Sequence, residues 1–295
     1  MIILADAGST KVDWLILGNN KDRTIKTNGI NPAVMSQSQI SDILHNELRP
    51  QLLENGVIDN CNSNINLENY IEVYYYGAGC TVPNIPKMKI MLQEIFGLGA
   101  KIEVESDLTA AACALFGNNK GIACILGTGS NSGLYNGQHI IHKVPAMGYI
   151  LGDEGSGAVL GRLFLNALYK GLLPEGLLGE FERQFSITLD DIISNVYHGN
   201  SPSKFLASTS VFIAKHLDIK QVENIVIENF RSFFRNNIKQ YSHPELEVGI
   251  VGSIACIYHK QLMKAADIEN IKIRMILKSP SERLAEYYKM HANHA

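Results

Sequence analysis

The chain has 295 residues, of which 46% are hydrophobic, so it is long enough for two ordinary domains with substantial cores. Its net charge of −3 and its pI near 6.3 argue against a dedicated nucleic-acid surface, because such surfaces carry a clustered basic excess. We therefore expect small-molecule ligands and no nucleic-acid partner.

The N-terminus and the cysteines predict a cytoplasmic protein. The opening MIILAD is typical of a strand and lacks the basic segment and long apolar core of a signal peptide, and no apolar run reaches membrane-spanning length. The cysteines are odd in number and far apart, without a Cys-x-x-Cys pair: Cys61, Cys80, Cys113, Cys124 and Cys256. This pattern favours reduced, buried thiols over metal or iron–sulfur ligands, and we expect no membrane partner.

The first part of the chain alternates strands with helices. Strands are expected at residues 2–8, 11–18 and 24–30, and Gly18-Asn19-Asn20 is a typical turn, so the three strands form an antiparallel meander. The later elements are a helix at 37–54, a strand at 73–76 that ends at Gly77-Ala78-Gly79, a helix at 86–96, a strand at 101–106 and a helix at 107–116.

A second unit begins near Gly117-Asn118-Asn119 and repeats the opening pattern. Residues 121–135 contain a strand, a turn rich in glycine and hydroxyl side chains, and a second strand, as residues 3–17 do. This recurrence indicates two α/β domains that are built alike. We predict an N-terminal domain at residues 1–117, a C-terminal domain with a helical insertion at 118–280, and a terminal helix at 281–295 that packs back on the first domain.

Three glycine turns are candidate nucleotide contacts. The first, Gly8-Ser9-Thr10-Lys11, lacks the spacing and the following helix of a Walker-type phosphate loop, so a phosphate-binding hairpin and a plain hairpin turn stay open. The second lies in LGTGSNSG and includes Gly127-Thr128-Gly129-Ser130; its three glycines and three hydroxyls exceed what a hairpin needs. The third, Gly252-Ser253, fits either a nucleoside contact or close strand-to-helix packing.

Two carboxylates suit phosphoryl transfer, which needs a metal on the phosphates and a base for the substrate hydroxyl. Asp6 ends the first strand beside the first glycine turn, where it could hold Mg²⁺ through water or simply form an Asx turn. Asp107 follows the strand at 101–106 and begins a helix, where it could act as a base, as a helix cap, or as both.

Residues 148–157, GYILGDEGSG, form what we term the acidic loop. Gly152, Asp153 and Glu154 place two adjacent carboxylates on a glycine-framed turn, and helix capping explains only one of them. Adjacent carboxylates can accept hydrogen bonds from neighbouring sugar hydroxyls. Asn31, in TNGINP, is a further candidate for a sugar contact, although an Asn-Pro turn also explains it.

Together these motifs resemble the acetate and sugar kinase, Hsp70 and actin superfamily, and within it the N-acetylglucosamine kinase-like branch related to the BadF/BadG/BcrA/BcrD ATPases. The resemblance spans nearly the whole chain. It rests on six segments in order: DAGSTKVDW, TNGINP, SDLTAAACA, LGTGSNSG, GYILGDEGSG and VGSIA. Two features depart from relatives: Ala-Gly-Ser stands where many have consecutive glycines, and the zinc-binding cysteine cluster of the bacterial repressor/kinase group is missing.

The resemblance implies two RNase H-like domains of the actin-like ATPase type with an interdomain cleft for ATP and substrate. It implies ATP and Mg²⁺ as cofactors, Asp107 as the base toward the 6-hydroxyl of N-acetylglucosamine or a related amino sugar, and Asp6 near the hydrated metal. The implied ATP contacts are Gly8, Ser9, Thr10, Lys11, Gly127, Thr128, Gly129, Ser130, Gly252 and Ser253. The implied sugar contacts are Asn31, Gly79, Asp107, Gly152, Asp153 and Glu154.

Two other functions stay open on the sequence. An activator ATPase would couple ATP hydrolysis to electron transfer in a partner enzyme through an iron–sulfur cluster shared by two subunits, although this chain has no closely spaced cluster ligands. A non-catalytic sugar sensor would keep the acidic loop but tolerate loss of Asp107 or of the glycine turns, and here all of these are present. A homodimer is also an open option.

Overall fold

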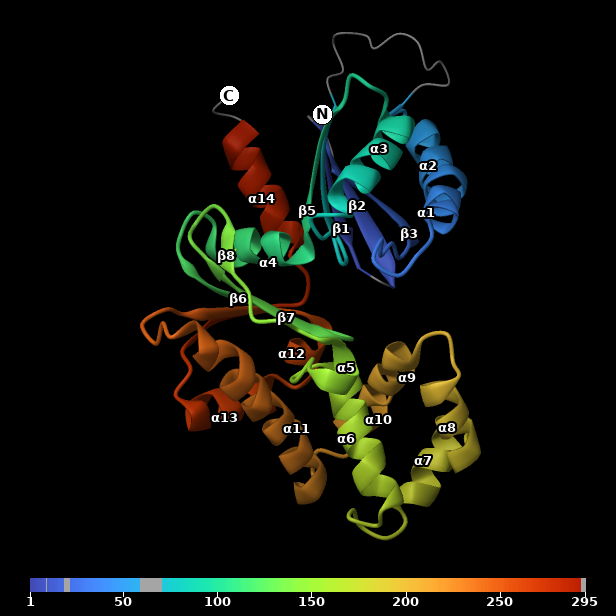
Figure 1. Ribbon diagram of the computed structural model, residues 1–295, viewed down its shortest axis with the longest axis vertical. Helices are drawn as coiled ribbons and strands as arrows, with labels where there is room; N and C mark the ends of the chain where they lie inside the picture. The colour runs from blue at the N-terminus through green and yellow to red at the C-terminus, as the bar shows by residue number, and fades with distance from the viewer. Residues whose placement is uncertain (9, 19–21, 59–70, 293–295) are drawn as a thin grey trace. The chain divides into compact units, whose positions relative to one another are not determined.

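The computed structural model describes residues 1–8, 10–18, 22–58 and 71–292. The chain divides into two compact units (Figure 1). Unit 1 comprises Met1–Gly117 together with Pro280–Ala295, and unit 2 comprises Asn118–Ser279. The chain therefore leaves unit 1 after residue 117 and returns to it at residue 280. The predicted turn at Asn19-Asn20 lies outside the described residues.

Unit 1 is built on a five-stranded sheet in the order β3-β2-β1-β4-β5. Its strands are β1 (Ile2–Ala7), β2 (Lys11–Leu17), β3 (Arg23–Asn28), β4 (Glu72–Gly77) and β5 (Lys101–Ser106). The first three strands form the predicted antiparallel meander, whereas β4 pairs parallel with β1, and β5 pairs parallel with β4. The carboxyl ends of β1, β4 and β5 therefore meet at one edge of this sheet.

The helices of unit 1 are α1 (Gln37–Ile43), the π-helical turn η1 (Leu44–Leu48), α2 (Arg49–Glu54), α3 (Ile85–Phe96), α4 (Asp107–Phe116) and α14 (Ser281–Ala292). Ser106 caps α4, since its hydroxyl oxygen accepts the backbone N–H of Thr109 at 3.3 Å. The prediction that Asp107 is the cap is therefore wrong: the hydroxyl one residue earlier fills that role, and Asp107 is the first helical residue.

The last helix, α14, packs against α4, β1 and β2 (Figure 1). Tyr288 packs its ring on Tyr74 with the ring centroids 4.2 Å apart, and its hydroxyl forms a hydrogen bond with that of Tyr76. Tyr74 and Tyr76 are two residues apart on β4 and thus share one face of the sheet. These aromatic contacts hold the returning chain on unit 1.

Unit 2 repeats this architecture with a five-stranded sheet in the order β10-β9-β6-β7-β8. Its strands are β6 (Gly121–Leu126), β7 (Ser130–Tyr135), β8 (Ile140–His142), β9 (Val248–Val251) and β10 (Ile273–Leu277). The strands β6, β7 and β8 are antiparallel neighbours, and β9 and β10 continue the sheet in parallel with β6. The two sheets have the same topology, which confirms the predicted α/β chain with two domains built alike.

Most helices of unit 2 lie between β8 and β9 in the sequence. They are α5 (Gly148–Leu151), α6 (Gly157–Tyr169), α7 (Leu177–Phe185), α8 (Leu189–Tyr197), α9 (Pro202–Ser208), α10 (Ser210–Lys215), α11 (Lys220–Phe233), the π-helical turn η2 (Phe234–Ile238) and the 3₁₀ turn η3 (Lys239–Tyr241), followed after β9 by α12 (Ser253–Ile257) and α13 (His259–Glu269). Phe164, Phe181 and Phe212 form a buried aromatic cluster that joins α6, α7 and α10.

Candidate functional site

The first glycine turn is a hairpin between β1 and β2. The N–H of Gly8 donates to the carbonyl of Lys11 at 3.0 Å, which closes the turn, and the Lys11 ammonium forms an ion pair with Asp13. The register places Asp6 of β1 directly opposite Asp13 of β2, so the two carboxylates share one face of the sheet. Ser9 lies outside the described residues.

Asp6 and Asp13 form the strongest candidate for cation binding in unit 1. Asp6 Oδ2 accepts a hydrogen bond from the hydroxyl of Ser281 at 3.1 Å, at the start of α14. Asp13 Oδ1 is buried and has no hydrogen-bond partner. A buried carboxylate oxygen beside a second carboxylate suits a divalent cation, and Mg²⁺ is commonly held by one or two carboxylates together with phosphates and water.

Asp13 was not predicted as a site residue. In the sequence it reads as one polar residue of the strand KVDWLIL, and only the hairpin register reveals that it mirrors Asp6 across the glycine turn. Among the described residues, no group of three or more His, Cys, Asp or Glu side chains is arranged to hold a metal ion.

Asp107 lies at the carboxyl end of β5, in the first turn of α4. Its Oδ1 accepts the backbone N–H of Leu108 at 2.8 Å. Cys80 lies in the turn after β4. Burial chiefly, and then the negative charge of the nearby Asp107 carboxylate, raise the pKa of the Cys80 thiol to about 12. The turn after β4 and the start of α4 are therefore neighbours.

Asn31 and Gly79 lie side by side at the same edge of the sheet. Gly79 has φ of +75°, and a Cβ atom built on it would lie 2.0 Å from Asn31 Oδ1. That Oδ1 accepts the N–H of Ala33 at 3.0 Å, and the N–H of Ala78 donates to the carbonyl of Ala7 at 2.8 Å. Unit 1 thus brings Asn31, Gly79 and Asp107 to the carboxyl edge of its parallel strands, where open α/β sheets bind ligands.

The second glycine turn joins β6 and β7 and is fastened to the N-terminus of α6. The N–H of Gly157 donates to the carbonyl of Gly127 at 2.8 Å, and that of Ala158 donates to the carbonyl of Thr128 at 3.1 Å. A Cβ on Gly129 would lie 3.0 Å from Asp153 Oδ2, a tight contact that glycine avoids. The turn is therefore fixed by α6 on one side and contacts the acidic loop on the other.

Asp153 sits in the acidic loop with φ of +52°, a left-handed conformation that Asp tolerates better than most residues. Its carboxylate accepts hydrogen bonds from the backbone N–H groups of Ser130 and Gly148, which favour the ionised form. Burial outweighs them and raises its pKa to about 6. Unit 2 thus places a perturbed carboxylate directly against the second glycine turn.

The neighbours of Asp153 are also tightly held. A Cβ on Gly152 would lie 2.0 Å from the carbonyl oxygen of Ala146, so glycine is required there. Glu154 accepts hydrogen bonds from the side-chain amides of Asn236 at 2.9 Å and Asn237 at 3.3 Å. The sequence gives no local signal for this contact, because the partners are 82 and 83 residues apart.

The third glycine turn, between β9 and α12, packs against the second. Gly252 has φ of +136°, and a Cβ on it would lie 2.1 Å from the carbonyl oxygen of Leu126, the residue before Gly127. The structure thus gives Gly252 a close-packing role, while the predicted nucleoside contact of Gly252 and Ser253 stays a prediction.

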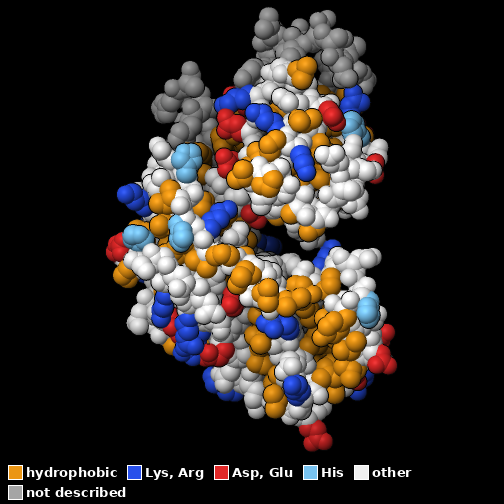
Figure 2. All heavy atoms as spheres, in the orientation of Figure 1, with side chains coloured by type: hydrophobic (Ala, Val, Ile, Leu, Met, Phe, Trp, Pro, Cys, Tyr) orange, Lys and Arg blue, Asp and Glu red, His pale blue; other side chains and the backbone are white. Residues whose placement is uncertain are grey.

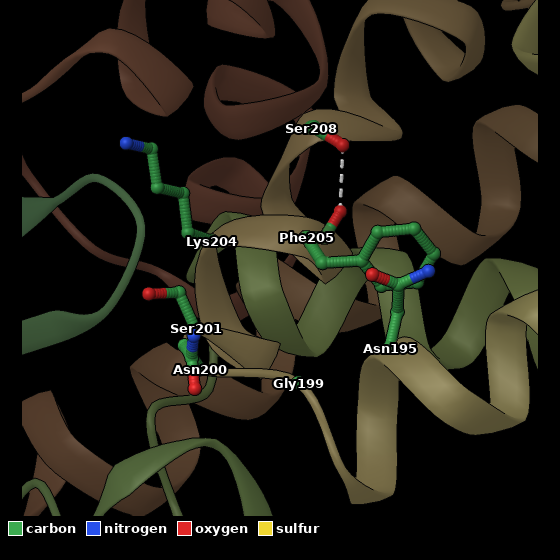
Figure 3. Close-up of a pocket in the computed structure, with 7 residues that line it drawn as sticks. All are labelled: Asn195, Gly199, Asn200, Ser201, Lys204, Phe205 and Ser208. Atoms are coloured by element: carbon green, nitrogen blue, oxygen red, sulfur yellow. Dashed lines mark hydrogen bonds between the residues drawn. The ribbon is translucent and has the colours of Figure 1, made fainter.

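A cavity of about 310 Å³ lies elsewhere in unit 2, at α8 and α9 (Figure 3). It is lined by Asn195, Gly199, Asn200, Ser201, Lys204, Phe205 and Ser208. None of these is a predicted site residue. In Figure 3 the Lys204 side chain extends away from Phe205 and Asn195, so the charged and aromatic groups do not converge on one point.

Apolar side chains also gather on the surface of the helical part of unit 2 (Figure 2). Leu189, Ile193 and Tyr197 are spaced four residues apart on α8 and are exposed.

No helix among the described residues combines the length and apolarity needed to cross a bilayer. The predicted homodimer stays a prediction.

Two α/β units of one topology, each with a glycine turn between its first two strands, define a chain of the sugar kinase and actin-like ATPase fold. No family model and no curated protein match the sequence, but solved structures do. One from Porphyromonas gingivalis is 42% identical, with a TM-score of 0.90 and 100% of both chains covered. One from Chromobacterium violaceum is 15% identical, with a TM-score of 0.69, 97% of this chain and 98% of that chain covered.

Both of those proteins are named putative N-acetylglucosamine kinases. The ethanolamine utilization protein EutJ from Carboxydothermus hydrogenoformans shares the fold at 12% identity and a TM-score of 0.50, with 93% of this chain and 84% of that chain covered. Because the Porphyromonas relative is similar over its full length, this chain belongs to the N-acetylglucosamine kinase-like family.

Proposed function

We propose that the protein is an ATP-dependent kinase that transfers the γ-phosphoryl group to a hydroxyl of an amino sugar, with the 6-hydroxyl of N-acetylglucosamine as the acceptor. The observation that carries this proposal is the grouping of Asn31, Gly79 and Asp107 at the carboxyl edge of the unit 1 sheet. The 42% identity to a protein named as a putative N-acetylglucosamine kinase supports the choice of sugar. An ATP and substrate cleft between the two units stays a prediction.

Asp107 is the proposed general base. In the reaction the sugar oxygen forms a bond to the γ-phosphorus while the bond from that phosphorus to the β,γ-bridging oxygen breaks, and the hydroxyl proton passes to the Asp107 carboxylate. The N–H of Leu108 and the other amides of the first turn of α4 favour the ionised carboxylate.

The glycine turns are the proposed ATP contacts. Thr10 and Lys11 in unit 1, together with Gly8 and Ser9, would bind phosphate oxygens. In unit 2 the first amides of α6 donate to the carbonyls of Gly127 and Thr128, while the N–H of Gly127 donates to Gly129 and that of Ser130 to Asp153. The N–H groups of Thr128 and Gly129 and the hydroxyls of this turn would then bind phosphate oxygens. Gly252 and Ser253 would border the adenosine.

The residues of unit 1 fit a magnesium ion. Asp6 and the orphaned oxygen of Asp13 are the groups that would hold it, directly or through water. When bound, Mg²⁺ would neutralise charge on the β- and γ-phosphates. The hydroxyl of Ser281 keeps the Asp6 carboxylate oriented on this face of the sheet.

Sugar contacts are assigned to Asn31, Gly79 and Asp107 in unit 1 and to Gly152 and Asp153 in unit 2. Glu154, also predicted as a sugar contact, is given a positioning role instead, because the amides of Asn236 and Asn237 each donate to one of its carboxylate oxygens. Asp153 accepts hydrogen bonds in its ionised form, and a carboxylate can accept from neighbouring hydroxyls at the same time. A cytoplasmic location is part of this proposal.

Two of the cysteines argue against an activator ATPase, while Cys113 and Cys256 are only partly buried. Cys80 and Cys124 are buried, and burial raises the pKa of each thiol, so neither is suited to ligate a cluster shared by two subunits. Cys61 lies outside the described residues. The presence of Asp107 in the arrangement described above favours a kinase over a sugar sensor.

The proposal is tested by ATP consumption of the purified protein across a panel of sugars, with and without Mg²⁺, followed by identification of the phosphorylated carbon. We expect turnover that needs both Mg²⁺ and an amino sugar, with phosphate on the 6-hydroxyl of N-acetylglucosamine. ATP hydrolysis that no sugar stimulates, in a preparation with an iron–sulfur absorption band, would replace the kinase with the activator ATPase.

A further inference from the structure

Three asparagine side chains from one helical segment hold the acidic loop. Asn229 lies on α11, and Asn236 and Asn237 lie on the π-helical turn η2 that continues it. All three donate or accept hydrogen bonds with residues 154–156, more than 70 residues earlier in the chain. We call this group the asparagine clamp.

Asn229 binds the backbone of the loop. It is only 1% exposed, and both ends of its amide are used: Oδ1 accepts the N–H of Gly155 at 2.9 Å and Nδ2 donates to the carbonyl of Ser156 at 3.2 Å. The backbone donor and acceptor fix the orientation of this amide. Gly155 has φ of +78°, and a Cβ there would lie 2.9 Å from Cβ of Phe233, so the loop is pressed directly onto α11.

Asn236 and Asn237 bind the Glu154 side chain. One donates to each carboxylate oxygen, at 2.9 Å and 3.3 Å. Successive residues of a regular α-helix point about 100° apart and do not face one partner. Here the N–H of Lys239 donates to the carbonyl of Phe234, the wider spacing of a π-helix, which occurs frequently at functional sites.

The loop in turn holds the second glycine turn. The Asp153 carboxylate accepts the N–H of Ser130, and the first amides of α6 donate to the carbonyls of Gly127 and Thr128. We infer that Asn229, Asn236 and Asn237 are positioning residues, which act through Glu154 and the acidic loop to hold Asp153 and the second glycine turn in their reactive arrangement. This inference rests on the proposed kinase function for its kinetic readouts, but not for its structural one.

A reciprocal exchange of donor and acceptor tests the clamp. Asn236→Asp, at an exposed position, sets a carboxylate against Glu154 and should push the loop away by charge repulsion. Glu154→Gln in the same chain restores the pair with its direction reversed, since the new amide nitrogen donates to the acid at 236 and its oxygen still accepts from Asn237. Asn195→Asp, on α8, is the matched control, because it also changes an amide to an acid.

Three measurements are made on each variant. Amide hydrogen exchange without ligands reports on residues 127–130 and 152–157. Binding of a nonhydrolysable ATP analogue and turnover report on the site. For Asn236→Asp we expect faster exchange in both segments and a loss in kcat/KM of up to about 100-fold, the loss that a 1 Å misplacement can cause. The double variant Asn236→Asp/Glu154→Gln should recover most of the hydrogen-exchange protection and most of the kcat/KM. Asn195→Asp should change neither quantity.

Unchanged hydrogen exchange in Asn236→Asp would overturn the clamp, whether or not the protein is a kinase. The double variant could recover its hydrogen-exchange protection without recovering analogue binding or turnover. That result would show that Glu154 acts through its own charge, and it would overturn the positioning role of Glu154. Failure of the kinase proposal is separate, because it would appear in the unmodified protein as an absence of sugar-dependent turnover.

Discussion

Gly79→Ala should lower the free energy of unfolding of unit 1 by an amount that the contacts of Gly79 predict. The residue has φ of +75°, where a Cβ costs about 1–2 kcal/mol, and that Cβ would lie 2.0 Å from Asn31 Oδ1. Relief of such overpacking typically costs about 1–3 kcal/mol more. Gly56→Ala is the matched control, since its φ is +65° but a Cβ there meets nothing within 4 Å.

Urea unfolding followed by fluorescence measures the difference cleanly. Trp14 is the one tryptophan of the sequence and is fully buried in the core of unit 1. Gly56 and Gly79 both belong to unit 1, so Trp14 fluorescence reports on the unit that contains both substitutions. We expect Gly79→Ala to lower the free energy of unfolding by about 1–3 kcal/mol more than Gly56→Ala does. Asn31→Ala in the Gly79→Ala background should return part of that difference. Equal losses in the two glycine variants would refute the claimed contact of Gly79 with Asn31.

Two further predictions concern carboxylates. Asp153 has a pKa of about 6 in the folded chain and an ordinary value of 3.8, so the folded state binds the proton more tightly than the unfolded state does. The free energy of unfolding should therefore fall as the pH rises from about 4 to about 6. Asp153→Asn should flatten that part of the profile of stability against pH, and an unchanged profile would contradict the burial of this carboxylate. Mg²⁺ should raise the urea midpoint reported by Trp14, and Asp13→Asn should reduce that gain; an equal gain in the variant would remove Asp13 from the cation site.

Local patterns in the sequence predict most of the fold. The alternation in KVDWLIL and the apolar faces of residues 37–54 and 86–96 depend on neighbours close in the chain, and the structure has β2, α1 to α2 and α3 at those places. The repeated glycine turn predicts the second domain for the same reason. Ser106 shows the limit of such patterns, since a capping hydroxyl and a following acid can each begin a helix.

The parts of the site that the sequence does not reveal depend on long-range contacts. Asp13 becomes a candidate only when the strand register sets it opposite Asp6. The asparagine clamp joins segments more than 70 residues apart through a π-helical turn, which has no periodic signature. Side-chain amides are also common on helix surfaces, so their partners are visible only in the folded chain.

The substitution Asp107→Asn tests whether Asp107 is the general base. The amide keeps an oxygen for the N–H of Leu108 and leaves the Ser106 cap in place, so the loss of stability should be small. It cannot accept the sugar proton, and loss of a positioned base lowers the rate by about 100- to 10,000-fold. Glu103→Gln, an exposed change on β5, the strand that precedes Asp107, is the control.

Turnover, sugar affinity and melting temperature are measured on one preparation of each variant. We expect Asp107→Asn to stay folded, to bind sugar with little change and to lose turnover by the stated factor, while Glu103→Gln should match the unmodified protein. A folded Asp107→Asn protein with nearly full turnover would show that Asp107 is not the general base.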